Sequence, residues 1–475
     1  MNQATTVKAE IPASGAGGSM ALALLVAGTF FMENLDSTVI TPALPAMAKS
    51  FAAPPVALNV GVSAYMLTLG VFIPLSGWVA ERFGPRGVFT AAIAAFTIAS
   101  LLCGLAPNLP VFVLTRVLQG MGGALMVPVG RLLVLRATPK HRLIGAIATL
   151  TWPALAALVL GPPLGGLIVD RASWRWIFYL NLPLGLIALA IASLVVPKST
   201  PKPAAPFDWP GFLLIGSGLF FLMALAEILA EPGAVWLPAA AASALAAGLL
   251  GLGVRRLRAA PHPMIDIAPL KIPTFAVTVW GGSLFRMGVS AVPFLLPVMF
   301  QIGFGFSPFE AGALLMAVFA GNLLMKPLTT PVLRQFGFRP VLLWNGLLNA
   351  VMIAACGAFT TATPLWLACI VLFIGGMARS MQFTALNTIA FADVPSRGMA
   401  NANTIFSTMF QLAMGLGVAL GAIAWRIGQA LSPPAAAAMP FRIAFVIVGF
   451  VALLGLIDCL KLAPAAGAHV ARKTA

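Results

Sequence analysis

The 475-residue sequence predicts an all-α polytopic membrane protein, and three observations support this class. Hydrophobic residues make up 60% of the chain and charged residues only 8%, with a mean hydropathy of +1.00. Apolar runs of about 20 residues recur along the chain, which is the helix length needed to cross roughly 30 Å of hydrocarbon. The connections between runs are short and rich in proline, glycine and basic residues. A membrane barrel would give shorter segments of alternating polarity, so a helical bundle is expected.

Fourteen apolar runs are expected to span the membrane. With the N-terminus placed in the cytoplasm, 18 of the 28 Lys and Arg residues fall in cytoplasmic segments, 5 on the other side and 5 within helices. This asymmetry predicts that both termini are cytoplasmic, and it explains the net charge of +16 without nucleic acid. The runs lie at about 20–44, 57–80, 87–106, 110–135, 144–169, 174–196, 210–230, 234–253, 273–300, 309–332, 339–360, 364–391, 401–426 and 440–462.

A short internal repeat predicts two related halves. ERFGPRGVF (81–89) follows the second run, and RQFGFRPVL (334–342) follows the tenth. Transporters built from two such halves bind substrate between them near the middle of the bilayer, although a coincidental short turn is the alternative. The expected organisation is a disordered tail at 1–19, a six-helix half at 20–196, two inserted linker helices at 210–253, a second six-helix half at 273–462 and a tail at 463–475.

Two carboxylates interrupt the first apolar run. A charge in hydrocarbon is costly unless it faces the protein interior or a water-filled cavity, so Glu33 and Asp36 are candidate functional residues. Residues three apart share a helix face, so we expect both acids to face one cavity. Two nearby carboxylates tend to keep one of them protonated, which suits proton exchange. The alternative is that either acid only caps or pairs locally.

Arg116 lies within the fourth run beside Gly120, Gly122 and Gly123, in LTRVLQGMGGA. Small residues let helices pack closely, but they do not explain a buried arginine. The helical rise places Arg116 at nearly the depth of Glu33, so we expect Arg116 to partner the carboxylates of the first run. Movement of Arg116 would then favour or disfavour protonation of its partner. A static structural ion pair is the alternative.

GWVAERFGPRG (77–87) occupies the tight loop after the second run and resembles the loop signature of the major facilitator superfamily. Glu81 stands where that family usually has Asp, and Pro85 where it often has a basic residue. The resemblance implies that this loop latches the two halves during alternating access. The residues that would form the latch are Gly77, Glu81, Arg82, Gly84 and Arg86.

Further segments resemble the fourteen-helix drug:proton antiporter branch of this superfamily. LGPPLGG (160–166) is similar to its antiporter motif, with Gly161, Pro162, Gly165 and Gly166 as the implied hinge, although Ala157 replaces a usual glycine. The run around Arg116 resembles the proton-coupling motif. LDSTVITPALP in the first run, with Thr41 and Pro42 where an Asn is usual, SWRWIFYLNLPLG (173–185), FDWPGFLL (207–214) and GFSPFEAG (305–312) resemble its other signatures.

Four other cations fall within apolar runs. Arg286 and Arg379 are candidates for a substrate cavity, where they would suit anionic or zwitterionic as well as neutral molecules. Arg131 and Lys326 lie near predicted cytoplasmic helix ends, so their long side chains are expected to reach the membrane interface. Packing is the simpler interpretation of the Met-rich and aromatic residues of the second half.

The resemblance implies a proton-coupled secondary transporter that exports small molecules or drugs. A proton-coupled transporter of one metabolite, such as an organic acid, a siderophore or an amino-acid derivative, is the alternative. The resemblance further implies a monomer in the bacterial inner membrane, in contact with lipid. The proton gradient would drive transport without a cofactor. A periplasmic adaptor and an outer-membrane channel are candidate partners. Only three histidines are present, and the four cysteines lack metal-ligand spacing, so neither an enzyme nor a metal site is expected.

Overall fold

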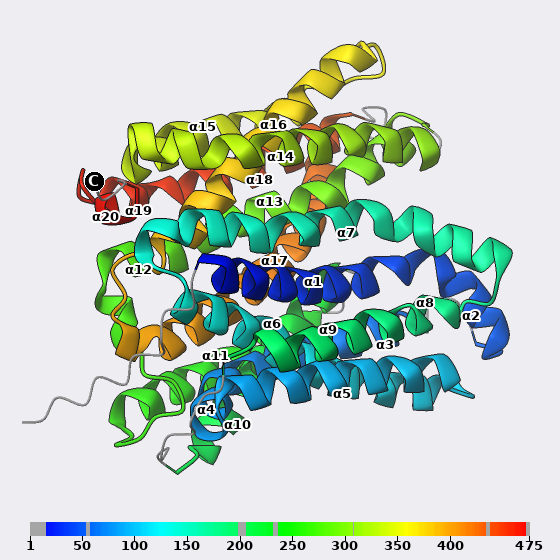
Figure 1. Ribbon diagram of the computed structural model, residues 1–475. Coiled ribbons are helices and arrows are strands. Elements are labelled where there is room, and N and C mark those ends of the chain that lie inside the picture. Colours follow the sequence, from blue (N-terminus) through cyan, green and yellow to red (C-terminus); the bar gives the residue numbers. More distant parts are fainter. Residues whose placement is uncertain are drawn as a thin grey trace, which may run out of the picture.

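The computed structural model describes residues 16–53, 58–197, 206–230, 236–306, 308–433 and 438–471. Within these ranges the chain is an all-helical bundle without a β-strand, as Figure 1 shows. Residues 1–15 and 472–475, which carry most of the predicted N-terminal tail and the end of the C-terminal tail, lie outside the described residues.

The first part of the bundle follows the predicted runs to within a few residues. The long α6 begins after Asn108, whose side chain accepts a hydrogen bond from the Val111 amide at 3.0 Å and so caps the helix. The elements are α1 (Ala16–Val39), η1 (Thr41–Ala43), α2 (Leu44–Ser50), α3 (Asn59–Phe72), η3 (Ile73–Leu75), α4 (Ser76–Phe83), α5 (Pro85–Leu105), α6 (Leu109–Ala137), η4 (Lys140–Arg142), α7 (Leu143–Arg171), α8 (Trp176–Tyr179) and α9 (Asn181–Val195).

Two helices follow, and then the second part of the bundle. Buried Asp208, just before α10, accepts a hydrogen bond from the Arg256 side chain of α11 at 3.1 Å and ties this helix pair together. The elements are α10 (Trp209–Ala230), α11 (Trp236–Ala259), η5 (Ala268–Lys271), α12 (Pro273–Val279), α13 (Gly281–Val298), the π-helical η6 (Met299–Gly303), α14 (Pro308–Phe336), α15 (Phe338–Cys356), α16 (Leu365–Ile389), η7 (Ser396–Gly398), α17 (Met399–Leu431), α18 (Met439–Leu454), α19 (Leu456–Leu460) and α20 (Ala468–Ala471).

Among the described residues, thirteen helical segments are long and apolar enough to cross a membrane. The helix α7 has 29 residues, and Leu143–Ala154 is its described apolar stretch. Several spans are interrupted rather than straight. The second changes to a 3₁₀ turn at Ile73–Leu75, which contains Pro74, because proline cannot donate the helical hydrogen bond.

The two repeat turns adopt the same backbone form. Gly84 joins α4 to α5 with φ of 81°, and Gly337 joins α14 to α15 with φ of 78°. Both are left-handed conformations that glycine adopts without a steric penalty. Equivalent glycines therefore reverse the chain at equivalent points of the two segments.

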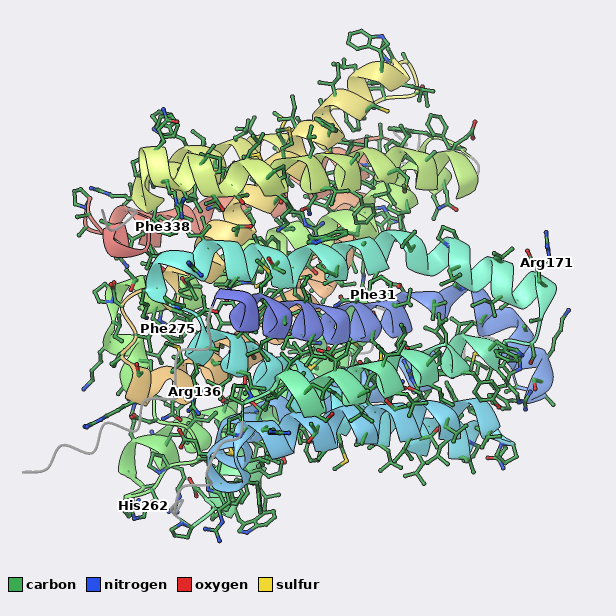
Figure 2. The ribbon with its side chains drawn as sticks, in the orientation of Figure 1. Phe31, Arg136, Arg171, His262, Phe275 and Phe338 are labelled. Atoms are coloured by element: carbon green, nitrogen blue, oxygen red, sulfur yellow. The ribbon has the colours of Figure 1, made fainter. Side chains whose placement is uncertain are left out.

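The long helices pack into two groups. Figure 1 shows α14, α15, α16 and α18 of one group above α1, α5, α7 and α9 of the other, with α17 passing between them. The first group contains α1, α3, α5, α6, α7 and α9, and the second contains α13 to α18. The α10–α11 pair contacts α3 of one group and α17 of the other. We refer to the two ends of the bundle as the Lys140 end and the Arg171 end. Figure 2 labels Arg136 near the first of these and Arg171 at the second.

Candidate functional site

Asp36 is buried in a polar network formed by the first helix group. Its side chain is 1% exposed and accepts three hydrogen bonds. Arg116 donates to one carboxylate oxygen at 2.7 Å, and Gln119 and Asn181 donate to the other at 2.9 and 2.8 Å. Arg116 is fully buried and lies opposite Asp36 as an ion pair. Burying a charge is tolerable only when it is paired and hydrogen-bonded, and Asp36 meets both conditions.

Sequence reasoning missed several members of this network. Gln119 also donates to Ser100 at 2.8 Å, and Asn181 donates to Ser100 at 3.3 Å. The Arg116 guanidinium lies over the Tyr65 ring, 4.5 Å from its centroid. The available signals were the three-residue spacing between Arg116 and Gln119 and the presence of Asn181 in an apolar segment. Ser100 and Tyr65 have no comparable signal in one sequence.

Glu33 belongs to a different region. It lines a central cavity of about 190 Å³ between the two helix groups, whereas Asp36 does not line that cavity. The expectation that both acids face one cavity is therefore wrong, as is the pairing of Arg116 with Glu33. Residues three apart on an α-helix differ by about 60° in direction, which is enough to turn Asp36 toward α6 and α9 and Glu33 toward the centre.

Tyr65 lies between the Asp36 network and Glu33. A Cβ atom added at Gly123 would lie 3.3 Å from both the Glu33 Oε2 atom and the Tyr65 hydroxyl, so both oxygens lie next to the same glycine. Neither oxygen has a hydrogen-bond partner in the described structure, although both are buried. The Tyr65 ring therefore contacts Arg116 with its face, while its hydroxyl lies near the cavity carboxylate.

The central cavity is lined by both helix groups. α1, α6 and α7 contribute from the first group, and α14, α16 and α17 from the second. Its charged residues are Glu33, Arg131, Lys326 and Arg379. Apolar contacts come from side chains that include Phe30, Phe383, Phe410 and Met414.

The prediction that Arg131 and Lys326 reach the membrane interface is wrong. Arg131 donates to Ser407 of the second group at 3.2 Å and lies over the Phe406 ring at 4.9 Å. Lys326 donates to Thr151 at 3.0 Å and to Thr384 at 3.3 Å. A long side chain near a helix end can extend either to the membrane interface or into the protein. These two side chains point into the protein because their faces of α6 and α14 border the cavity.

The two arginines predicted for a cavity have different positions. Arg379 lines the cavity and is 7% exposed. Arg286 is 1% exposed and does not line it, because its guanidinium donates to the Thr278 carbonyl and to the Asn387 side chain. Arg286 lies over the ring of Phe410, which is a cavity residue, at 5.2 Å. It therefore supports the cavity wall from behind.

The Gly77–Gly87 loop contacts the second helix group through its glycine rather than its charges. A side chain at Gly77 would collide with Thr404 of α17, so the two helices touch at this point. Glu81 lies 3.9 Å from Arg136, and Arg86 donates to the Ser193 carbonyl at 2.9 Å, and both partners belong to the first group. Arg82 is exposed and Gly84 provides the turn.

A stronger contact between the groups comes from Lys140, which the sequence did not single out. Its ammonium donates to the carbonyls of Phe391, Ala392 and Val394 beyond α16, at 2.5, 2.9 and 3.1 Å. Carbonyls at a helix C-terminus lack helical partners and favour a cation. Burial lowers the pKa of Lys140, and nearby Asp393 acts in the opposite direction. Asn403 adds a second link at this end, by donating to the Pro128 carbonyl at 2.8 Å.

The segment 160–166 packs against α1 close to Asp36. Side chains at Gly161 and Gly165 would collide with Thr38 and with the Val39 carbonyl, so both glycines permit a close approach of α7 to α1. Gly166 has no neighbour within 4 Å and makes no such contact. The side chain of Pro162 lies outside the described residues.

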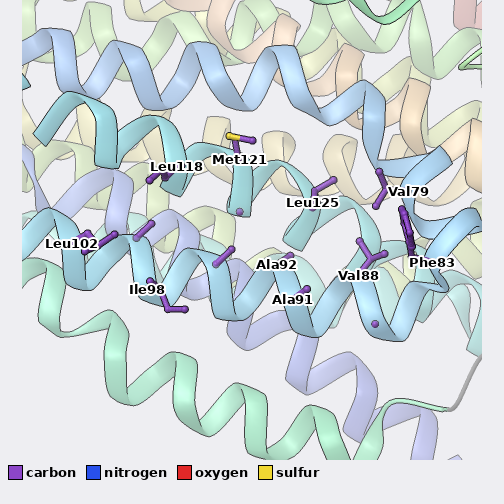
Figure 3. A pocket seen from close by; sticks show the side chains of 14 residues that line it. Val79, Phe83, Val88, Ala91, Ala92, Ile98, Leu102, Leu118, Met121 and Leu125 are labelled. Atoms are coloured by element: carbon purple, nitrogen blue, oxygen red, sulfur yellow. The ribbon is translucent and has the colours of Figure 1, made fainter. Parts of the chain in front are cut away.

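A groove on the outside of the bundle contrasts with the central cavity. Figure 3 shows its lining side chains on α4, α5 and α6, which are all apolar. The groove measures about 560 Å³ and contains residues such as Ile98 and Leu118 that are well exposed. A surface of this kind suits acyl chains, and it offers no group that could orient a polar ligand. Elsewhere in the described chain, no cluster of three or more metal-binding side chains occurs.

Comparison with known proteins places this bundle in a family. A family model described as "Major Facilitator Superfamily" matches residues 26–418. The chain belongs to the Major Facilitator Superfamily. A protein of Salmonella paratyphi A named "Putative multidrug resistance protein MdtD" is 36% identical over 407 residues, 85% of this chain and 86% of that protein. A protein of the same name from Escherichia coli O6:H1 is 36% identical over 403 residues, 84% of each chain.

Solved structures share the superfamily fold. The proton:xylose symporter XylE has a TM-score of 0.65 at 17% identity, over 96% of this chain and 98% of its own. The human organic anion transporter MFSD10 has a TM-score of 0.63 at 14% identity, over 93% and 99%. At these identities the likeness concerns the fold alone. The chain is thus a multi-pass membrane transporter of this superfamily.

Proposed function

We propose that the chain exports small molecules or drugs by alternating access, in exchange for protons. The relatives named for multidrug resistance support the substrate class and direction. Proton coupling is supported by a series of neighbouring residues between the cavity and the buried ion pair. The series consists of Glu33, Tyr65, Arg116 and Asp36.

The two acids have different roles in this proposal. Asp36 forms a buried ion pair with Arg116 in this state, so its charge is compensated within the protein. Glu33 faces the cavity, where it exchanges a proton or meets substrate. A movement of Arg116 away from Asp36 would leave a buried carboxylate without its cation, so the position of one guanidinium would couple the conformation to proton binding.

We further propose that the Lys140 end is cytoplasmic and closed in this state. Lys140, Asn403 and Gly77 all join the two helix groups at that end. Opening it requires these contacts to break together, which is a rearrangement of two packed bodies about a central site. The charge latch predicted for Glu81, Arg82 and Arg86 would then not join the two groups in this state. It would stabilise the first group, or it would join the groups in another conformation.

The membrane setting completes the proposal. We propose fourteen membrane helices, arranged as two six-helix halves with α10 and α11 inserted and with both termini in the cytoplasm. The thirteen described spans and the 29-residue α7 support this count. We place the protein in the bacterial inner membrane as a monomer that uses the proton gradient and no cofactor. A periplasmic adaptor and an outer-membrane channel are the proposed partners for export across a second membrane.

The test is substrate-driven proton flux in liposomes that contain the purified protein and an internal pH indicator. A lipophilic cation, an organic acid that stays ionised and a neutral drug are added in turn. We expect at least one class to drive flux, Asp36→Asn to abolish it and Glu33→Gln to reduce it. Asp170→Asn is the matched control, because Asp170 is an exposed carboxylate outside the cavity. Flux that survives in both Asp36→Asn and Glu33→Gln would disprove the coupling. The absence of flux with all three substrate classes would disprove the proposed exchange of substrate for protons.

A further inference from the structure

The central cavity carries more positive than negative charge. Arg131, Lys326 and Arg379 line it, against Glu33 as its only carboxylate in the described chain. Asp36 does not alter this balance, because Arg116 neutralises it in the adjacent network. The ion pairs found among the described residues do not include any of the three cavity cations.

The hydrogen-bond partners of these cations among the described residues are neutral. Arg131 and Lys326 donate there to the hydroxyl groups of Ser407, Thr151 and Thr384. Glu33 also attracts Arg131 electrostatically. Arg379 makes no hydrogen bond within the described structure. Its one contact of note is with the Phe383 ring, 5.7 Å from the centroid, and its buried Nε atom has no acceptor. A buried cation without a counter-ion is costly, so an anion in the cavity would relieve that cost.

Lys326 and Arg379 are held side by side by the packing of α14 on α16. Side chains at Gly321 and Gly376 would collide with the backbone of the opposite helix, so the two helices are in close contact. Lys326 reaches across to Thr384 of α16, five residues beyond Arg379. Both cations therefore line the cavity from one closely packed pair of helices.

We infer that the transported substrate is an organic anion with a compact apolar body. Its carboxylate or sulfonate would bind to Arg379 and Lys326, because the planar guanidinium matches two oxygens and the ammonium adds a third donor. The apolar body would pack against Phe383, Phe410 and Met414. An engineered protein cavity of about 150 Å³ accepts benzene, so 190 Å³ suits a substituted benzene ring. This inference rests on the proposed function and names its substrate class.

The charge of the substrate sets how the membrane potential acts on transport. One anion leaving for one entering proton moves two charges in the same electrical direction. A neutral substrate moves one charge, and a monovalent cation moves none. An interior-negative potential would therefore favour export of an anion most strongly.

The experiment compares three ligands with the same ring, which are benzenesulfonate, benzenesulfonamide and benzylammonium. Their binding to the purified wild-type protein is measured by calorimetry. We expect binding of benzenesulfonate and at least tenfold weaker binding of the other two, since a charge-assisted hydrogen bond is lost. Arg379→Gln and Lys326→Met should each weaken benzenesulfonate binding about tenfold or more, and Arg379→Lys should fall between wild type and Arg379→Gln. Arg171→Gln is the control, because Arg171 is exposed at one end of the bundle.

The thermal unfolding of each variant is recorded without ligand, so that a loss of binding is separated from a loss of fold. Equal or tighter binding of benzylammonium, no binding of benzenesulfonate, or wild-type binding by a folded Arg379→Gln variant would each overturn the inference. If benzylammonium drives proton flux and benzenesulfonate does not bind, the exporter stands and the anion assignment fails. If benzenesulfonate binds through Arg379 and no substrate drives proton flux, the anion site stands and the proposed coupling fails.

Discussion

The Asp36 network and the central cavity are neighbouring polar regions with opposite states of pairing. Arg116 is fully buried with a carboxylate at 2.7 Å and a glutamine oxygen within hydrogen-bond distance. Arg379 is nearly as buried, at 7% exposure, but it faces an aromatic ring and the cavity. The Arg116 charge is compensated by a carboxylate, although its Nε and Nη2 atoms have no acceptor in the described structure, whereas Arg379 has neither a carboxylate nor an acceptor for its Nε atom there. The two regions therefore differ in charge compensation, and this difference underlies the proposed anion site.

The two regions also differ in which helices build them. α1, α5, α6 and α9, all of the first group, contribute Asp36, Ser100, Arg116 and Asn181. The cavity combines side chains of both groups. A relative movement of the groups would therefore preserve the network and rebuild the cavity. Coupling between the two regions must pass through residues at their border, of which Tyr65 is the clearest.

The largest expected effect comes from breaking the pair in the network. Arg116→Met leaves Asp36 charged and buried with only neutral donors, which should lower the free energy of unfolding by about 3–5 kcal/mol. Asp36→Asn leaves Arg116 uncompensated and should cost a similar amount. The loss would be measured by thermal unfolding in detergent without substrate.

A double variant tests whether the two residues act as a pair. Asp36→Asn combined with Arg116→Met removes both charges, so it should be destabilised by clearly less than the sum of the single variants. Arg171→Gln, which removes an exposed arginine, should change stability very little. Additive losses in the double variant would show that Arg116 and Asp36 contribute independently.

Sequence alone predicted the helical class, the approximate helix positions and that Arg116 partners a carboxylate of the first run. It did not predict which acid binds Arg116. The helical rise gives the depth of a residue in the membrane, but the direction in which its side chain leaves the helix decides which partner it meets. The inward direction of Arg131 and Lys326 was missed for a related reason. A residue near the end of an apolar run can reach either the interface or a cavity, and only the packing of α6 and α14 against other helices decides which.

Lys140 shows a further limit of a single sequence. A lysine in a short basic loop is typical of membrane topology, and nothing local indicates that it binds carbonyls about 250 residues later. Gln119, Ser100 and Asn181 are equally ordinary residue types, and they become a network only when four helices converge on Asp36. These contacts are long-range, so they are properties of the bundle rather than of any segment.

A smaller effect is expected for Lys140, whose ammonium donates to three backbone carbonyls of the other group. Lys140→Met removes these hydrogen bonds, and one hydrogen bond to a charged group contributes roughly 1.5–3 kcal/mol. The equilibrium should shift by about tenfold or more toward a state that is open at the Lys140 end. Spin labels on Arg142→Cys and Ser396→Cys, in a background without the native cysteines, would report this as a larger population of long distances.

Lys271→Met is the control for this shift, since Lys271 is exposed and has no hydrogen-bond partner from its ammonium among the described residues. An unchanged distance distribution in Lys140→Met would show that the carbonyl contacts do not hold the end closed. A shift of similar size in both variants would point to net charge rather than to specific hydrogen bonds.

The smallest change in stability is expected for Arg379→Met, which is the same substitution as Arg116→Met in the neighbouring region. Because Arg379 has no carboxylate partner among the described residues, removing its charge eliminates an uncompensated cost. The substrate-free protein should therefore unfold at the same temperature or be stabilised by up to about 1 kcal/mol. Thermal unfolding of the two methionine variants side by side gives the measurement. A loss for Arg379→Met as large as that for Arg116→Met would mean that the cavity arginine is structural. An Arg379→Met variant that is stable but no longer binds the anion would instead show that Arg379 serves ligand binding rather than folding.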